Sequence, residues 1–304
     1  MSASHSPVFQ GTKEVIATLS YVQKFAGSTI VIKLGGAALQ DSSLVDSICE
    51  DLIRIRAVGV SAVLVHGGGK DINEELTRRG ITWDFFEGQR VTSDEMMDVI
   101  EMVLCGLVNR RIVRALNAAG VKAVGFSGSD AGTLVCKPAD PRLGRVGVID
   151  KVNPGLIQSV LALNHDSGVP TIPVIAPIGL GKDGRSYNIN ADWAASRIAS
   201  ALGVTKMMFL TDQDGILDKN QRLIPELDAS ELEQVIETGV VSGGMLAKAR
   251  TVVHALRHKV TDVHILNARR PHGLIEELFT DRGVGTVCRV RARTRTAPLE
   301  LEKV

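Results

Sequence analysis

Two glycine-rich turns are the positions at which the backbone of this chain could bind an anion. The apolar run Ala62–Val65 stops at His66 and gives way to three glycines, Gly67–Gly69, and the run Ser28–Ile32 leads into the turn Lys33–Gly36. A helix-like pattern follows each turn. Glycine lets a backbone approach a ligand closely, and its N–H groups add to the positive end of the next helix. The order therefore predicts an anion site, although a tight turn without a ligand is the alternative.

The two turns should lie side by side. A β-α-β unit is formed by the strand Ser28–Ile32, a helix at Leu44–Ala57 and the strand Ala62–Val65. This order implies parallel strands and a right-handed crossover. Open parallel sheets bind ligands at the carboxyl ends of their strands. Neither turn has the G-x-x-x-x-G-K-[ST] or G-x-G-x-x-G spacing of the known phosphate loops. The turns alone therefore do not identify the ligand.

Two lysines stand where a phosphate could be bound. Lys33 ends the first strand, and Lys248 should lie in the first turn of a helix that Gly243 and Gly244 open. A lysine at a helix N-terminus is unfavourable unless an anion is bound there. Phosphoryl transfer depends mostly on positioning and charge neutralisation, which two lysines can provide. The alternative is that Lys248 points into solvent.

Asn188, Asn190 and Asp192 form a third candidate group. Asn190 is a good N-cap for the helix that follows, and Asp192 belongs in its first turn, where it could hold both lysines. Capping alone explains Asn190 and Asp192 but leaves Asn188 free to bind a ligand. Arg90 follows an irregular stretch and could bind a carboxylate with two hydrogen bonds, with a surface ion pair as the alternative.

The composition excludes several classes of function. The 304 residues include 35 basic and 34 acidic side chains, so no overall field favours nucleic acid or an acidic membrane. No apolar run approaches the roughly 20 residues that span a bilayer, and the N-terminus lacks the features of a signal peptide. The four isolated cysteines suit a reducing cytoplasm. His254 and His258 are expected on a solvated helix face, and no metal site is predicted.

Alternating strands and helices predict an α/β sandwich of two lobes. Thr92–Glu95 has the form of a capping box and should start a long helix that ends near Ala118. Thr171–Ile178 should form one strand, and the loop 212–218 should follow a buried strand at the ligand edge. The expected divisions are an N-terminal helix (1–27), an N-terminal lobe (28–187), a C-terminal lobe (188–288) and a disordered tail (289–304).

Taken together, these stretches resemble the amino acid kinase family, and within it the branch that phosphorylates N-acetyl-L-glutamate. The matches run in the same order from about Ile30 to Val287. They are VIKLGG (Val31–Gly36), VLVHGGG (Val63–Gly69), GQRVT (Gly88–Thr92), IEMVL (Ile100–Leu104), KVNP (Lys151–Pro154), NINAD (Asn188–Asp192), LTDQDGILD (Leu210–Asp218), SGGMLAK (Ser242–Lys248) and ELFTDRGVGT (Glu277–Thr286).

The resemblance implies a carbamate kinase-like fold, which is a three-layer α/β/α sandwich around a mainly parallel sheet. It also implies ATP-dependent formation of an acyl phosphate, N-acetyl-L-glutamyl 5-phosphate, with Mg²⁺ bridging the ATP phosphates. The implied catalytic residues are Lys33, Lys248 and Asp192. Gly35 and Gly36 would bind the phosphoryl group; Gly68, Gly69, Arg90 and Asn188 the acceptor; and Asp212, Gly215 and Leu217 the nucleotide.

The stretch Leu19–Gly27 resembles the N-terminal helix of an arginine-inhibited subgroup that forms hexamers as trimers of dimers. The implied inhibitor site includes Tyr21, Glu277 and Gly283. Some family members bind a PII-type signalling protein, but nothing in this sequence indicates such a partner. Two alternatives stay open: a related kinase that acts on a carrier-linked aminoadipate, and a non-catalytic regulatory homologue.

Overall fold

The computed structural model describes residues 16, 19, 20, 22–36, 39, 41–163, 171–280 and 283–290. Tyr21 and nearly all of the predicted tail therefore lie outside the described residues. In the described part, residues 16, 19, 20 and 22–25 are helical. No helix in this part is both long enough and apolar enough to cross a membrane.

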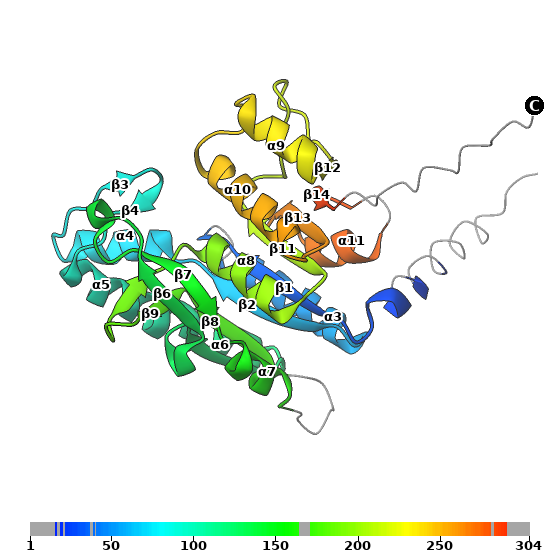
Figure 1. Cartoon of the computed structure of the whole chain (residues 1–304). Coiled ribbons are helices and arrows are strands. Elements are labelled where there is room, and N and C mark those ends of the chain that lie inside the picture. The colour runs from blue at the N-terminus through cyan, green and yellow to red at the C-terminus, as the bar shows by residue number, and fades with distance from the viewer. Residues whose placement is uncertain are drawn as a thin grey trace, which may run out of the picture.

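An eight-stranded sheet forms the centre of the molecule (Figure 1). Its strands, in spatial order, are β12 (Glu226–Asp228), β14 (Thr286–Arg289), β13 (Asp262–Asn267), β11 (Lys206–Thr211), β1 (Thr29–Leu34), β2 (Ser61–His66), β8 (Ile172–Ala176) and β5 (Ala123–Ser127). Neighbouring strands are parallel except for the antiparallel pair β13–β14. The mainly parallel sheet is confirmed, and β1 and β2 are neighbours, so their glycine turns lie side by side.

Two smaller sheets accompany the central one. One contains β10 (Ser186–Asn188), β9 (Ile178–Gly181), β6 (Leu134–Pro138) and β7 (Gly147–Val152), and the other is the short pair β3 (Phe85–Phe86) and β4 (Gln89–Arg90). The prediction of one strand at Thr171–Ile178 is wrong. The chain leaves the central sheet after Ala176 and enters the smaller sheet at Ile178, and the intervening Pro177 has no N–H for a strand ladder.

Helices cover both faces of the central sheet, which confirms the three-layer sandwich (Figure 1). Alternation along β1 separates the two cores: Ile30 and Ile32 pack on one side and Val31 on the other. The first side carries α3 (Ser42–Ala57), α4 (Gly69–Arg78), α5 (Asp94–Glu101), α6 (Asn109–Ala118) and α11 (Gly273–Phe279). The second side carries α7 (Gly155–Leu161), α8 (Ala191–Leu202), α9 (Ala229–Glu237) and α10 (Gly243–Arg257). Two short 3₁₀ turns, η2 (Asp130–Gly132) and η3 (Pro141–Leu143), lie in connections.

The long helix after Arg90 differs from its prediction in two ways. Its N-cap is Ser93, whose hydroxyl accepts a hydrogen bond from the Met96 N–H at 3.2 Å. The capping box at Thr92 is wrong, because the Thr92 hydroxyl donates instead to the Arg90 carbonyl at 2.9 Å. The helix is also not α-helical throughout, since a π-helical segment, η1 (Met102–Val108), joins α5 to α6.

Candidate active site

Asp192 lies between Lys33 and Lys248 and forms an ion pair with each. One carboxylate oxygen, Oδ1, is 2.7 Å from Lys33 Nζ, and the other, Oδ2, accepts a hydrogen bond from Lys248 Nζ at 2.7 Å. All three side chains are largely shielded from solvent, with exposed fractions of 12%, 14% and 8% in the order Lys33, Asp192, Lys248. The structure thus brings the three predicted catalytic residues together in one row.

Local structure explains the row. Lys33 shares the face of β1 with Val31, and this face packs against α8. The side chain of Asn190 caps α8 by accepting from the N–H groups of Asp192 at 2.9 Å and Trp193 at 3.3 Å, so Asp192 lies in the first helical turn. Lys248 lies in the second turn of α10 rather than the first, and it is buried, which excludes the alternative of a solvent-facing lysine.

The electrostatics of the row favour the charged form of Asp192. Burial alone would raise the pKa of Asp192, but the ammonium groups of Lys33 and Lys248 outweigh it and hold the pKa well below its usual range. Burial lowers the pKa of Lys248, and Asp192 opposes that shift. The row therefore carries two cations and one anion, and it has one positive charge in excess for an incoming anion.

A cavity of about 430 Å³ opens on the Lys33 side of the row. It is lined by glycines of both turns and by Arg90 and Asn188. The buried Nη1 atom of Arg90 has no hydrogen-bond partner among the described residues, while its Nη2 atom donates to Asn73 Oδ1. Burial lowers the pKa of Arg90. A buried guanidinium with a free N–H at a cavity suits a carboxylate ligand.

Asn188 and Arg90 share one wall of this first cavity, and hydrogen bonds connect them. Asn188 Nδ2 donates to the Thr92 hydroxyl at 3.3 Å, and that hydroxyl donates to the Arg90 carbonyl. Arg145 strengthens the wall by donating to Asp94 Oδ1 at 2.9 Å and to the Ser186 carbonyl at 3.1 Å. Arg145 was missed at the sequence level because its partners are 41 and 51 residues away along the chain.

The glycines of the two turns have different surroundings. Gly36, Gly68 and Gly69 line the first cavity. Gly35 does not fit the prediction of a phosphoryl-binding N–H, because its N–H donates to the Leu210 carbonyl at 2.9 Å. A Cβ atom at Gly35 would lie only 2.6 Å from that same oxygen. Gly35 is therefore required for the close approach of β1 and β11.

A second cavity, of about 570 Å³, opens on the Lys248 side of the row. It contains all three predicted nucleotide-binding residues, Asp212, Gly215 and Leu217. Asp192 lines both this cavity and the first one. The ion-paired row therefore lies where the two cavities meet, and an anionic group that passes from one to the other would contact both ammonium groups.

The histidine pair on α10 is not simply a solvated face. His254 is half-buried, and its ring packs edge-on against Trp193 with centroids 5.0 Å apart. Burial lowers the pKa of His254 to about 4. His258 is exposed and stacks on His254 at 4.0 Å. The prediction is therefore wrong for His254. The described residues also contain no group of three or more His, Cys, Asp or Glu that could hold a metal ion.

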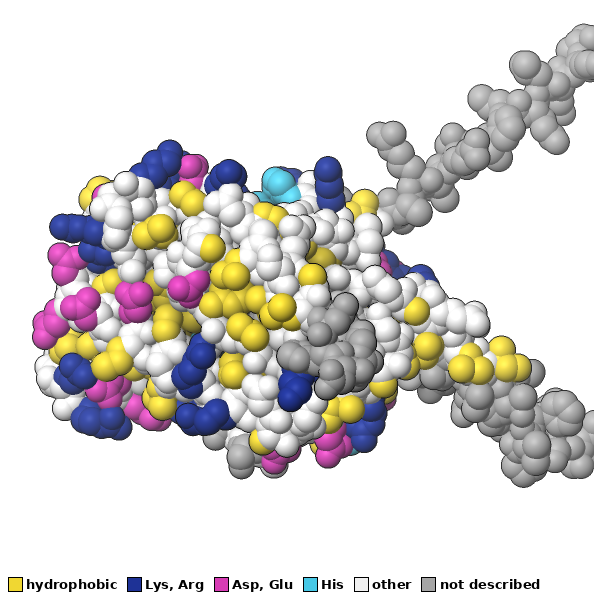
Figure 2. Space-filling model, turned by 90° about the horizontal axis from the view of Figure 1, so that it is seen from below, with side chains coloured by type: hydrophobic (Ala, Val, Ile, Leu, Met, Phe, Trp, Pro, Cys, Tyr) yellow, Lys and Arg dark blue, Asp and Glu magenta, His cyan; other side chains and the backbone are white. Residues whose placement is uncertain are grey.

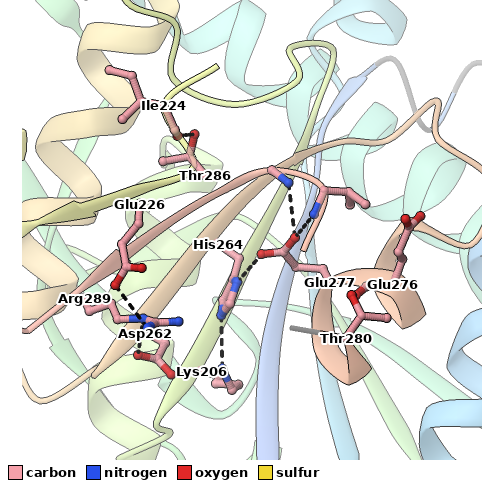
Figure 3. Close-up of polar contacts among 12 residues, drawn as sticks. Lys206, Ile224, Glu226, Asp262, His264, Glu276, Glu277, Thr280, Thr286 and Arg289 are labelled. Atoms are coloured by element: carbon pink, nitrogen blue, oxygen red, sulfur yellow. Dashed lines mark hydrogen bonds and ion pairs between the residues drawn. The ribbon is translucent and has the colours of Figure 1, made fainter. Parts of the chain in front are cut away.

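Glu277 belongs to a buried cluster with His264 and Lys206 (Figure 3). Gly283 lies beside it, since a Cβ atom at Gly283 would be 2.8 Å from Glu277 Oε2. Glu277 Oε1 is 2.5 Å from His264 Nδ1, and His264 Nε2 is 3.1 Å from Lys206 Nζ. The other oxygen, Oε2, accepts from the N–H groups of Val284 at 2.6 Å and Gly285 at 3.2 Å. The cluster contacts the N-terminal segment, because Lys206 Nζ lies 4.9 Å from the ring of Phe25.

Sequence comparison relates this chain to one family of enzymes. The model of the "Amino acid kinase family" matches residues 28–267. The chain is 43% identical to the acetylglutamate kinase of Clostridioides difficile (strain 630), over 90% of this chain and 96% of that protein. It is 42% identical to the acetylglutamate kinase of Jannaschia sp. (strain CCS1), over 92% of this chain and 99% of that protein.

Solved structures show the same fold. N-acetylglutamate synthase from Neisseria gonorrhoeae, complexed with coenzyme A and N-acetyl-glutamate, superposes with a TM-score of 0.80 at 25% identity, over 95% of this chain. This chain spans only 64% of the length of that synthase. Carbamate kinase from Giardia lamblia superposes with a TM-score of 0.62 at 17% identity, over 88% of this chain and 99% of that one. The extent of these matches shows that this chain belongs to the amino acid kinase family and is a phosphotransferase.

Proposed function

We propose that this phosphotransferase moves the γ-phosphoryl group of ATP to the side-chain carboxylate of N-acetyl-L-glutamate. The observation that carries the proposal is the row Lys33–Asp192–Lys248, which lies between two cavities. The name shared by the curated relatives supports this acceptor. The product would be N-acetyl-L-glutamyl 5-phosphate.

The first cavity, which lies on the Lys33 side of the row and which we call the acceptor cavity, fits a ligand with two carboxylates. Arg90 has a free Nη1 donor for the α-carboxylate, and the hydrogen-bonded Asn188 lies on the same wall. The second carboxylate would then reach toward Lys33 and the N–H groups of Gly68 and Gly69, which line the cavity with Arg90. L-Glutamate also has two carboxylates but carries a charged amine where this acceptor carries an amide, so the two can be compared directly.

The transfer needs no proton. An oxygen of the acceptor carboxylate forms a bond to the γ-phosphorus, the bond to the bridging oxygen breaks, and ADP leaves with that electron pair. A glutamate-type carboxylate with a pKa of about 4.3 is already ionised at neutral pH. Lys33 and Lys248 would neutralise the moving phosphoryl group, and Asp192, whose pKa is held low, would hold the two lysines in place instead of acting as a base.

ATP would occupy the second cavity, where Asp212 offers the kind of oxygen ligand that Mg²⁺ accepts alongside phosphate oxygens. Mg²⁺ bound with the nucleotide would neutralise part of the phosphate charge. The residues of this chain would supply the remaining positive charge through Lys248, whose ammonium group lines the same cavity.

The test is ATP-dependent acyl phosphate formation trapped with hydroxylamine, with N-acetyl-L-glutamate, L-glutamate and L-aspartate as acceptors. Signal with N-acetyl-L-glutamate alone is expected. Lys248→Met should abolish it, whereas Lys182→Met, at a surface lysine that is 81% exposed, should not. A folded protein that binds ATP but gives no signal with these acceptors would favour an aminoadipate-type acceptor. Absence of ATP binding would favour the non-catalytic role.

We also infer feedback inhibition by L-arginine through the cluster around Glu277, together with hexamer formation through the N-terminal segment. Phe25 of this segment packs against Phe279 of α11, with ring centroids 6.2 Å apart. Ile16 and Leu19 are 58% and 56% exposed, and Figure 2 shows hydrophobic side chains along the segment that projects from the body. Such apolar exposure suits a subunit contact.

Arginine titration of the activity, with light scattering for the mass, tests this second inference. The paired change Ile16→Glu with Leu19→Glu should lower the mass and weaken the inhibition. An active enzyme that arginine does not affect would overturn the inhibitory part. A mass that the paired change does not alter would overturn the part played by the N-terminal segment.

A further inference from the structure

We propose that His66 and Asn109 form a positioning pair that aims the N–H of Gly68 into the acceptor cavity. His66 is the last residue of β2 and is completely buried. Its Nδ1 atom lies 2.8 Å from the Gly67 carbonyl oxygen, and its Nε2 atom lies 3.1 Å from Asn109 Nδ2. This inference rests on the proposed function and adds two residues to it that do not line either cavity.

The hydrogen bonds of Asn109 determine which nitrogen of His66 carries the proton. Asn109 Nδ2 donates to the Val174 carbonyl at 2.9 Å, and its Oδ1 accepts from Arg110 Nη2 at 2.6 Å. A carbonyl can only accept and a guanidinium can only donate, so the amide cannot be flipped. The second hydrogen on Nδ2 then points to His66 Nε2, which must be the acceptor. In the neutral ring the proton is therefore on Nδ1, where it is donated to the Gly67 carbonyl.

His66 stays neutral over the working pH range. Burial lowers the pKa of His66 to about 4, and Arg110 also lowers it, whereas the Gly67 carbonyl and Asp71 oppose the shift. Asp71 lies on α4 and Arg110 on α6. Arg110 is held in place by Asn109 and by the Gly125 carbonyl, to which it donates at 2.6 Å.

The planar peptide group between Gly67 and Gly68 links the direction of the Gly67 carbonyl to the direction of the Gly68 N–H. In a trans peptide the C=O of one residue and the N–H of the next point in opposite directions. Because His66 holds the Gly67 carbonyl on one side, the Gly68 N–H points to the other side, where Gly68 lines the acceptor cavity. No described residue accepts a hydrogen bond from this N–H. It is thus a preorganised donor for a transferring anion.

Two apolar side chains of the π-helical segment η1 also lie close to Gly68. A Cβ atom at Gly68 would lie 2.5 Å from Leu104 Cδ2 and 3.3 Å from Val108 Cγ2, both of which belong to η1. Asn109 is the first residue after η1. A π-helix bonds residue i to residue i+5 rather than i+4, so this segment alters the helix face on which Asn109 lies. The irregular turn therefore presents Asn109 to His66 and two apolar side chains to Gly68.

The first experiment measures the wild-type protein and needs no activity; a variant of the pair serves only to assign its signal. Nitrogen-15 NMR of histidine-labelled protein reports which ring nitrogen carries hydrogen, and His66→Asn identifies the resonance among the seven histidines of the chain. The expected result is a neutral ring with hydrogen on Nδ1 from pH 6 to pH 9. Hydrogen on Nε2, or a charged ring at pH 7, would overturn the proposal even if the proposed reaction were correct.

The second experiment measures kinetics, with Asn109→Leu and Asn109→Asp compared with Asn117→Asp on the same helix. Asn109→Leu frees the ring and should lower kcat by about tenfold to a hundredfold, while the KM for ATP should stay within about twofold, because one preorganised donor is misaligned. Asn117 bonds only to the carbonyls of Val113 and Ala123 and the Ala123 N–H, so its variant should keep the wild-type kcat.

Asn109→Asp gives a pH signature that a structural role would not produce. A carboxylate at position 109 attracts the proton to Nε2, so a hydrogen on Nδ1 remains only while the ring is doubly protonated. The variant should therefore be most active at low pH and lose kcat as the pH rises through the increased pKa of His66. The kcat of the wild type should show no such fall. A wild-type kcat and pH profile in both Asn109 variants would overturn the proposal. An inactive wild type with hydrogen on Nδ1 would instead refute only the proposed reaction.

Discussion

Replacing Asp192 with asparagine removes the anion that Lys33 and Lys248 share. The variant keeps the volume of the side chain but leaves two ammonium groups that are only 12% and 8% exposed without their partner. Removing one member of a buried ion pair costs about 3–5 kcal/mol. At about 2 °C per kcal/mol, the melting temperature should fall by about 6–10 °C.

The same variant should respond to pH in a defined direction. Burial lowers the pKa of Lys248 in the wild type, and Asp192 limits that shift, so its removal lowers the pKa further. A basic group whose pKa is lower in the folded state binds more protons in the unfolded state, and the free energy of unfolding then rises with pH. The deficit of Asp192→Asn relative to wild type should therefore shrink as the pH rises from 7 toward the ordinary lysine value of 10.5.

Thermal unfolding at pH 7 and pH 9, with and without ATP, measures both effects. ATP should stabilise the variant more than the wild type, because its phosphates supply the missing negative charge. Asp150→Asn is the control, since Asp150 pairs with the exposed Lys182 at 3.7 Å and such surface pairs contribute about 0–1 kcal/mol. A melting temperature within about 2 °C of wild type at pH 7, with kcat unchanged, would falsify the assignment of Asp192 as the residue that holds the lysines.

Three further substitutions test other parts of the structure. Arg90→Lys should raise the KM for the acceptor about tenfold to a hundredfold without affecting the KM for ATP, because one charged hydrogen bond of about 1.5–3 kcal/mol is lost; equal changes in both constants would contradict this role. Gly68→Ala should lower both kcat and the melting temperature, because its Cβ would lie 2.5 Å from Leu104 Cδ2, and adding Leu104→Ala should restore the melting temperature more than kcat. Glu277→Gln should destabilise the protein by about 1–3 kcal/mol in thermal unfolding, because His264 and two backbone donors lose their charged acceptor. The same variant should abolish arginine inhibition. An unchanged arginine titration would show that this cluster takes no part in regulation.

Local patterns predicted most elements of the fold. Asn190 caps α8 as predicted, and its side chain accepts from the backbone N–H groups two and three residues ahead. The parallel pairing of β1 with β2 followed from the β-α-β order. Such features depend on neighbours in the chain, so a single sequence contains the information that determines them. The short strands β3, β4 and β12 were missed because two or three residues carry too little periodicity.

The candidate site was predicted in its residues and in part of its geometry. Position in the chain singled out Lys33, Lys248 and Asp192 and predicted that Asp192 could hold both lysines, and the resemblance gave them catalytic roles. Only the fold shows that Lys248 lies in the second turn of α10 and that both ion pairs form at once across 56 or more positions of the chain. The resemblance implied a phosphoryl-binding role for Gly35. The fold shows that its N–H is used within the sheet, because β1 and β11 meet at that point.

The π-helical segment shows why a correct helix prediction can still miss the chemistry. Val99, Val103 and Leu107 continue an apolar pattern that fits a regular helix, and Leu107 is nevertheless 45% exposed. The extra residue in the turn is stabilised by contacts outside the helix, where Leu104 and Val108 face Gly68 and Asn109 faces His66. Neither contact leaves a periodic signal in the sequence. π-Helical turns are rare and occur frequently at functional sites. Here the turn lies beside Gly68, whose backbone N–H the proposed reaction requires.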